Sequence, residues 1–484
     1  MQLEPRLGRD RPFLTMAFVA LLVPCLLPER SMAADNTPPA RLVAGAADNT
    51  LPSALARAYQ TNPVLNAERA RQRGTDENVP IALSGYRPQL NVNLAPSLIA
   101  VRAIMYETGM LQTATLRGYT AQATINQILF NGFKTGNKVR QAEASVRSGR
   151  EALRGVEQSV LLDAVTAYGN VLANQALVDA QRANVAFLRE TIAATRQRLE
   201  TGDVTPTDLA QTESRLSRGL ADLNTAEVNL AVSRAAFRQV IGNRPGWLAP
   251  AEPVDRLLPR TEDDAVVVAR RDNPAVLSAS YDVDAAQYAI RVEESALYPT
   301  LGAQGTLMRQ ENADPLLTMR RMEQASVIGQ LNLPIYDGGL AAAQVRQAKE
   351  MLTQTRIGLD RVRLATEAAA IGAWETNEGA KVGVKAAEAE VRAATIVLEG
   401  VQRETRVGQR SILELLNSQQ ELVGARSRLI AAQRDRLVAS YTLLSAIGRL
   451  DHQRLGLPTP SYEPRTHYHQ VRDAWHGLRT PSGQ

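Results

Sequence analysis

Residues 119–142 read YTAQATINQILFNGFKTGNKVRQA, and within this segment one periodicity gives way to another. From Tyr119 to Leu129 apolar side chains alternate with Thr, Gln and Asn, the period-two pattern of a strand with one polar face. No proline occurs from 137 to 200, and about 64 residues of helix would extend for about 95 Å. Because a compact domain needs no helix of that length, the segment predicts a membrane-type strand that leads into a long helix.

The same arrangement occurs twice in the chain. Residues 325–348 read ASVIGQLNLPIYDGGLAAAQVRQA. Like 119–142, this segment has an alternating stretch, then a glycine-containing turn, and then Val-Arg-Gln-Ala. Asn62-Pro63 likewise recurs as Asn273-Pro274. Several landmarks in one order at a nearly constant offset indicate an internal duplication. We therefore expect two copies of one unit, over 51–242 and 264–448.

Each copy is expected to hold a helix, a pair of strands and a long helical hairpin. For the first copy the expected helix, strands and long helix are 51–84, 88–105, 115–130 and 137–200, with a hairpin tip near 202–208. For the second copy they are 264–297, 299–310, 325–336 and 341–410, with a tip near 408–414. Residues 243–263 would link the two copies, and 449–484 would follow the second copy and end in a disordered tail.

The N-terminus is typical of a secretory signal peptide over 1–34, with a flexible segment over 35–50. Three arginines precede an apolar stretch of 15 residues, 13–27, and small residues follow at 31–34. A transmembrane anchor is the alternative, but a span needs about 20 apolar residues. We expect the chain to leave the cytoplasm, and Cys25, its only cysteine, to be removed with the signal.

Counting strands predicts an oligomer. Four strands per chain cannot close into a membrane barrel, since the smallest single-chain barrels have eight. An open sheet edge is not tolerated in lipid, where every backbone polar group needs a partner. The barrel must therefore be shared between chains, and strand counting leaves the number of chains open.

Composition argues against several classes of function. Aromatics are 4% of the chain although apolar residues are 44%, which favours close helix packing through small side chains over a large enzyme core. One cysteine excludes a disulfide framework, and the net charge of +5 is spread among nearly equal numbers of acids and bases. The chain lacks a phosphate-binding glycine loop, a zinc-protease motif and a nucleophile elbow. We expect no enzyme activity, no cofactor, no metal and no nucleic-acid partner.

Several motifs of the two copies occur together in one known family: the Asn-Pro pairs, Tyr86-Arg87-Pro88-Gln89-Leu90, Tyr336-Asp337-Gly338-Gly339, the tip from Gly408 to Leu416, and Ile447-Gly448. Over about 51–457 this pattern resembles the TolC family of outer-membrane channel-tunnels. The resemblance implies a mixed equatorial region, with an equatorial linker over 243–263 and an equatorial segment after 449. The resemblance implies a fold that is mainly α with membrane β: a homotrimer with a twelve-stranded barrel in the outer membrane and a helical tunnel through the periplasm. It also implies docking on a periplasmic adaptor that an inner-membrane ABC transporter feeds.

Within the family the sequence looks most like the outer-membrane component of type I protein secretion, as in an adenylate cyclase-haemolysin toxin exporter. The exported substrate would then be a large protein. A drug-efflux outlet is the alternative, because the tunnel is the same in both. An exported coiled-coil structural protein is the alternative of another class, and the strands and signal argue against it.

The resemblance also places a gate at the hairpin tips. By position Asp208 and Arg410 match residues that pair in the family, and Glu414 matches the first of two acids that line the constriction. Asn417 replaces the second acid and Thr405 a tip tyrosine, so three-fold symmetry would give a ring of glutamates beside a ring of asparagines. A ring of acids predicts cation selectivity. The alternative is that both acids simply stabilise helix N-termini.

The turns themselves are the expected docking surface for the adaptor. The residues assigned to it are Gly202, Val204, Gly408 and Ser411. Beyond Pro458 the sequence holds His467, His469 and His476 with Trp475. His-x-His could bind a metal, but four prolines in this stretch favour a disordered tail.

Overall fold

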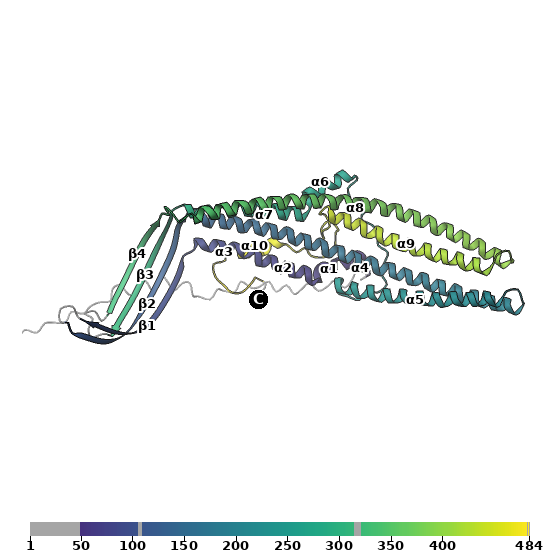
Figure 1. The fold of residues 1–484 in the computed structure, drawn as a ribbon, viewed down its shortest axis with the longest axis horizontal. Coiled ribbons are helices and arrows are strands. Elements are labelled where there is room, and N and C mark those ends of the chain that lie inside the picture. The colour runs from purple at the N-terminus through teal and green to yellow at the C-terminus, as the bar shows by residue number, and fades with distance from the viewer. Residues whose placement is uncertain (1–48, 105–108, 314–320, 482, 484) are drawn as a thin grey trace, which may run out of the picture. The chain divides into compact units, whose positions relative to one another are not determined.

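The computed structural model describes residues 49–104, 109–313, 321–481 and 483, and all elements below belong to one unit, Ala47–Gly477 (Figure 1). The predicted signal peptide and nearly all of the segment 35–50 lie outside the described residues. None of the helices in the described ranges combines the length and apolar character needed to cross a membrane.

The chain forms two similar series of elements. The first series is α1 (Leu51–Thr61), α2 (Pro63–Asp76), α3 (Asn78–Leu83), η2 (Ser84–Tyr86), β1 (Gln89–Ile104), β2 (Leu111–Asn131), α4 (Lys134–Glu200) and α5 (Pro206–Ile241). After η3 (Asp255–Leu257), the second series is α6 (Glu262–Asp272), α7 (Pro274–Glu294), η4 (Ser295–Leu297), β3 (Thr300–Ala313), β4 (Arg321–Asn332), α8 (Leu340–Arg406) and α9 (Ile412–Ala446). A last helix, α10 (Pro464–Val471), follows. The expected fold class, mainly α with four strands and two repeats, is confirmed.

The first helix of each series is broken at its Asn-Pro pair, where the sequence predicted one continuous helix. Asn62 caps α2 by accepting from the backbone N–H of Val64 at 2.9 Å, and its amide donates to the carbonyl of Val240 at 2.9 Å. Asn273 caps α7 in the same way and donates to the carbonyl of Ala446 at 2.9 Å. The proline that follows lacks an N–H, which costs nothing at a helix start. Each asparagine thus joins a helix start to the end of its own copy's returning helix.

The four strands form one antiparallel sheet in the order β1-β2-β3-β4, with β1 and β4 at its edges. The register pairs Leu90 with Ile125 and Val92 with Ala123, so one face is apolar. Asn91 pairs with Thr124, and such pairs make the other face polar. In the chain alone the apolar face is open: Leu94 is 70% exposed. An exposed apolar face of this kind marks an interaction surface, here one suited to lipid.

Short turns with left-handed backbone connect the sheet to the long helices. Gly132 has φ +63° between β2 and α4, and a Cβ there would lie 2.6 Å from the carbonyl oxygen of Ser295. Phe133 follows at φ +66°, which is rare for an aromatic residue. In the second copy Gly338 and Gly339 take the same conformation without strain.

The long helices pack as two antiparallel hairpins, α4 with α5 and α8 with α9, and α4 also packs on α7 and α9 (Figure 1). Alanines such as Ala164 and Ala370 are fully buried, which lets the helices approach closely. The largest buried cluster surrounds Tyr168 and Phe237, whose ring centroids are 6.4 Å apart. The Tyr168 hydroxyl donates to the carbonyl of Ala249 at 2.6 Å, so the equatorial linker is fixed to this cluster. We call this cluster the equatorial core.

The expectation of a disordered C-terminal tail differs from what the structure shows. Residues 449–475, the C-terminal strap, include α10 and lie against α1, α2 and α4. His467 Nδ1 lies 3.1 Å from the buried Asp76 carboxylate, and His452 Nδ1 lies 2.9 Å from Glu157. Partners so distant in sequence leave no local periodicity, which is why a proline-rich polar segment was taken for an unstructured one. In the described ranges, no group of three or more potential ligands forms a metal site.

Candidate functional site

The two hairpin tips close with the same backbone turn. Gly202 has φ +82° and Gly408 has φ +77°. The N–H of Asp203 donates to the carbonyl of Arg198 at 2.9 Å, and that of Gln409 donates to the carbonyl of Glu404 at 2.9 Å. These bonds are those of the glycine-terminated helix ending, in which a left-handed residue lets the chain reverse. A Cβ on either glycine would meet nothing within 4 Å, so the requirement is conformational.

The returning helices begin with the same capping box. Thr205 Oγ1 accepts from the N–H of Asp208 at 3.2 Å, and the Asp208 carboxylate accepts from the N–H of Thr205 at 3.0 Å. Ser411 and Glu414 make the equivalent pair at 3.3 Å and 3.1 Å. The Thr205 N–H lowers the pKa of Asp208. The Ser411 N–H, followed by the Arg410 guanidinium, lowers the pKa of Glu414. Both acids therefore act as part of helix N-terminal caps.

Arg410 is engaged within its own tip. Its Nε donates to Glu404 at 2.9 Å and its Nη1 donates to Glu414 at 3.0 Å. Asp208 bonds to Thr205 in the other tip. The described contacts of the single chain do not join Asp208 to Arg410, and the expected link between the two tips stays a prediction. Within the chain, each charge has its partners in its own tip.

Other residues make the connection between the hairpins. Arg198, in the last turn of α4, donates to the backbone carbonyls of Thr405 at 3.3 Å and Arg406 at 3.4 Å. The Thr405 carbonyl also accepts from the N–H of Gly408 at 3.2 Å, and both carbonyls belong to the last turn of α8, where the regular helical bonds stop. A guanidinium also suits the negative end of a helix dipole. Arg198 is therefore a cap that the first hairpin supplies to the second.

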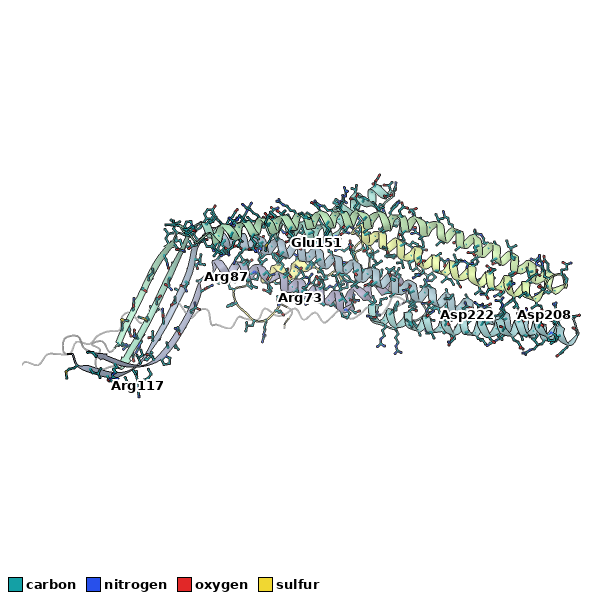
Figure 2. The ribbon with its side chains drawn as sticks, viewed as in Figure 1. Arg73, Arg87, Arg117, Glu151, Asp208 and Asp222 are labelled. Atoms are coloured by element: carbon teal, nitrogen blue, oxygen red, sulfur yellow. The ribbon has the colours of Figure 1, made fainter. Side chains whose placement is uncertain are left out.

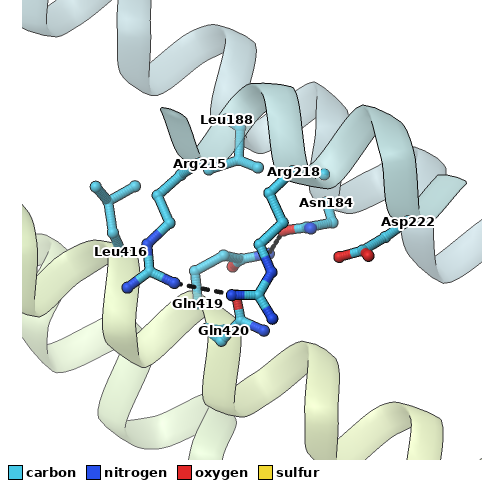
Figure 3. Close-up of a pocket in the computed structure, with 9 residues that line it drawn as sticks. Asn184, Leu188, Arg215, Arg218, Asp222, Leu416, Gln419 and Gln420 are labelled. Carbon is cyan, nitrogen blue, oxygen red and sulfur yellow. Dashed lines mark hydrogen bonds between the residues drawn. The ribbon is translucent and has the colours of Figure 1, made fainter. Parts of the chain in front are cut away.

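Two further polar links lie between about one and five turns from the tips, and Figure 3 shows the first of them. The Gln419 amide of α9 donates to the Asn184 amide oxygen of α4 at 3.0 Å, and this pair is buried. Arg215 of α5 donates to Asn417 at 3.0 Å. In Figure 3 side chains from α4, α5 and α9 converge on this point, with Arg218 beside them. Asn417, predicted to form a polar ring, is thus engaged with α5 in the single chain.

Apolar contact between the hairpins near the tips is small. Leu188, Ile412 and Leu416 are buried together, with Val204 packed against them. A recess of about 370 Å³ lies between α4, α8 and α9 near these side chains, and Arg198 and Thr405 line it. The hairpins therefore meet through a few polar bonds over a thin apolar contact.

The remaining predicted tip residues divide into two groups. Gly202, Gly408 and Ser411 are exposed, as a docking surface requires. Val204 is half-buried, and Thr405 is buried with its hydroxyl donating to the Val401 carbonyl at 2.7 Å. Thr405 contributes to the link through its backbone carbonyl, while its side chain is used within α8.

Reasoning from the sequence did not single out Arg198, Arg215, Asn184 or Gln419. Their partners lie more than 200 residues away, and arginine is abundant throughout the chain. A buried amide in a long helix gives no local signal. The duplication offered one clue: Arg198 stands where the second copy has Glu404, so the two tips differ in charge at equivalent positions.

The sequence and the fold of this chain are similar to those of known proteins. The sequence profile "Outer membrane efflux protein" matches residues 54–243 and 265–449. The chain is 39% identical to outer membrane efflux protein BepC of Brucella suis, over 91% of this chain and 94% of that protein. It is 25% identical to alkaline protease secretion protein AprF of Pseudomonas aeruginosa, over 71% and 72%. The CmeC outer membrane channel of Campylobacter jejuni superposes with a TM-score of 0.73 at 15% identity, covering 87% of this chain and 89% of CmeC.

Proposed function

The chain belongs to the outer membrane efflux protein family, the TolC family, and on that premise we propose that it is the outlet of an efflux assembly for small molecules. Members of this family are transport channels without enzyme activity. They form trimers whose strands build a β-barrel in the outer membrane and whose helices build a periplasmic tunnel, and they work with adaptors and inner-membrane pumps.

The identity of the cargo rests on the relatives. The 39% identity to an efflux protein along nearly the whole chain supports small-molecule efflux. Protein export through an ABC transporter is the second candidate, and the 25% identity to a protease secretion protein favours it. The finer sequence-based prediction, greatest likeness to a toxin exporter, is not borne out, because the relative at 39% identity is an efflux protein and the identity to protein CyaE of Bordetella pertussis is 28%. The higher identity to an efflux protein leads us to place efflux first.

We further propose that the hairpin tips form the periplasmic gate. The observation that supports this is the contact between hairpins: a few polar bonds, from Arg198, Arg215 and Asn184, over a small apolar cluster. Such bonds can be exchanged for bonds to water at little net cost. The adaptor would dock on the exposed turns at Gly202 and Gly408 and draw the hairpins apart.

Deletion of the gene tests the cargo. Loss of an efflux outlet lowers the minimal inhibitory concentrations of several unrelated drugs and leaves the proteins of the culture medium unchanged. Loss of a protein exporter removes a protein from the medium and leaves drug sensitivity unchanged. Restoration by the wild-type gene on a plasmid is the control. A deletion strain that changes in neither respect contradicts both candidates.

A further inference from the structure

The C-terminal strap follows a defined course along the first copy. Its partners on α4 change from Glu157, at His452, to Glu143, which lies 3.9 Å from Arg472. On the other side Tyr462 donates its N–H to the Tyr59 hydroxyl at 3.0 Å. Fourteen residues of α4 correspond to about 21 Å. The strap therefore runs from the equatorial core toward the end of α4 that adjoins the sheet.

Trp475 lies at the end of this course, at the base of β1. Arg87 donates from Nη1 to the carbonyl of Ala474 at 2.6 Å, and its guanidinium carbon lies 4.8 Å from the centroid of the Trp475 ring. The Trp475 side chain is 68% exposed in the chain. Figure 2 labels Arg87 where the helices meet the sheet. A large aromatic ring is thus fixed in place on an arginine and left open on its other side.

Arg87 and Trp475 lie at the height along the molecule where the membrane boundary is expected. Arg87 stands two residues before β1, and the exposed apolar side chains of that strand begin at Leu90. At about 3.3 Å per residue, Arg87 is about 10 Å from the first apolar position. The helices belong to the periplasmic tunnel, so this end of the sheet meets the periplasmic leaflet.

The second copy carries an aromatic residue at the position equivalent to Arg87. Tyr298 is the equivalent of Arg87 in the duplication, before Pro299 as Arg87 is before Pro88, and it is 49% exposed. Tyrosine and tryptophan are enriched where a membrane protein passes through the headgroup region, because their rings are apolar with one polar group. At this position the first copy has Arg87, with the exposed Tyr86 before it, and the strap adds the larger ring of Trp475.

We propose that Arg87 and Trp475 form an anchor that binds phospholipid headgroups of the periplasmic leaflet. The guanidinium would pair with lipid phosphate and the indole would lie at the boundary of the acyl chains. The strap would lie on the outer face of the tunnel wall, since three copies along the inner face would narrow the passage. The membrane surface is the occupant that continues the lipid contact of β1.

Single-tryptophan variants test the anchor. Trp247→Phe with Trp374→Phe leaves only Trp475, and Trp374→Phe with Trp475→Phe leaves only Trp247. Trp247 is a matched control because it is 66% exposed and belongs to the equatorial linker. In vesicles containing lipid with a nitroxide on the headgroup, Trp475 emission should fall about twofold and Trp247 emission should not change. An equal fall in emission of the two variants, or no fall in either, overturns the proposal.

The quencher also identifies other occupants. Quenching of Trp475 by aqueous iodide but not by labelled lipid means that the ring faces water, and protection from both means that a neighbouring subunit covers it. Either result overturns the anchor. If the double variants do not form trimers, the difference in emission between wild type and Trp475→Phe supplies the same measurement.

A variant of Arg87 tests the contribution of the arginine to the anchor. Arg87→Ala removes the stacking partner and should abolish the lipid quenching of Trp475. Arg73→Ala, in the last turn of α2, is the control and should leave the quenching unchanged. Unaltered quenching in Arg87→Ala contradicts the role given to the arginine. Because quenching does not depend on cargo, these results are independent of the proposed efflux function.

Discussion

The equatorial core and the tips hold the same two hairpins together by different means. At the equator Tyr168, Phe237 and many smaller apolar side chains are buried in one continuous cluster. At the tips three apolar side chains are buried with Phe187, Val204 and Leu216 half-buried against them, and polar bonds supply the rest of the contact. Burial of large apolar surface is not readily reversed, whereas polar bonds exchange with water at small net cost. The comparison indicates a fixed pivot at the equator and a reversible closure at the tips.

The largest expected effect is at the pivot. Phe237→Ala should lower the free energy of unfolding by about 3–5 kcal/mol, because Phe237 is 1% exposed and truncation leaves a cavity. The measurement is thermal dissociation of the purified trimer, with single-channel conductance recorded below the transition. Conductance should stay at the wild-type value, since the tips are unchanged.

Val232→Ala is the control on the same helix, because Val232 is 64% exposed in the chain and should cost less than about 0.5 kcal/mol. A Phe237→Ala trimer that dissociates like wild type, or that conducts more than wild type, contradicts the assignment of a rigid pivot.

The second effect is at the closure. Arg198→Ala should raise the open population of the channel about fivefold, because it removes bonds worth about 1 kcal/mol from the end of α8. Single-channel conductance and open time in planar bilayers measure it. Thermal dissociation should not change.

Arg196→Ala is the matched control for Arg198. Arg196 lies two residues away and pairs with Glu213 at 2.8 Å inside the first hairpin, so its loss does not release the second. The double variant Asp208→Ala with Arg410→Ser should have a smaller effect than Arg198→Ala, since both side chains bond within their own tips. If the double variant opens the channel and Arg198→Ala does not, the direct link expected from the sequence is restored.

The third effect is the pH dependence of the stability that Asp272 contributes. Arg271, and then Arg449 at 2.9 Å, lowers the pKa of Asp272 to about 2. A carboxyl with a depressed pKa stabilises the fold above its unfolded value and loses that contribution as pH falls through the folded value. Asp272→Asn should therefore cost about 1 kcal/mol at pH 7, and this cost should shrink as pH falls from about 4 through about 2 and vanish only below that value. Thermal dissociation of the two proteins across this range measures the difference, and a constant difference contradicts the assignment.

Much of the architecture could be predicted from the sequence, and the links between hairpins could not. The duplication, the strand alternation after Gln89 and the proline-free helices are local patterns, and so are the capping residues Ser411 and Glu414. The bonds of Arg198 and Gln419 join segments more than 200 residues apart and depend on how the helices pack. The same holds for the strap, whose His467 is ordered by Asp76. Local signals specify elements, whereas contacts between copies need the three-dimensional structure.

The smallest expected effect concerns the negative charge of Glu414 in the second tip. Glu414→Gln should reduce cation selectivity, measured as the reversal potential in a salt gradient, because it removes one carboxylate per subunit near the entrance. Glu421→Gln, two turns farther along α9, is the control and should change it less. In wild type the Ser411 N–H and Arg410 lower the pKa of Glu414, so it stays charged at pH values where an ordinary glutamate is protonated. Selectivity should consequently persist on acidification and disappear only below the ordinary range. Arg410→Ala removes one cause of the shift and should move that loss to higher pH, while an unchanged pH profile would show that Glu414 does not face the permeating ions.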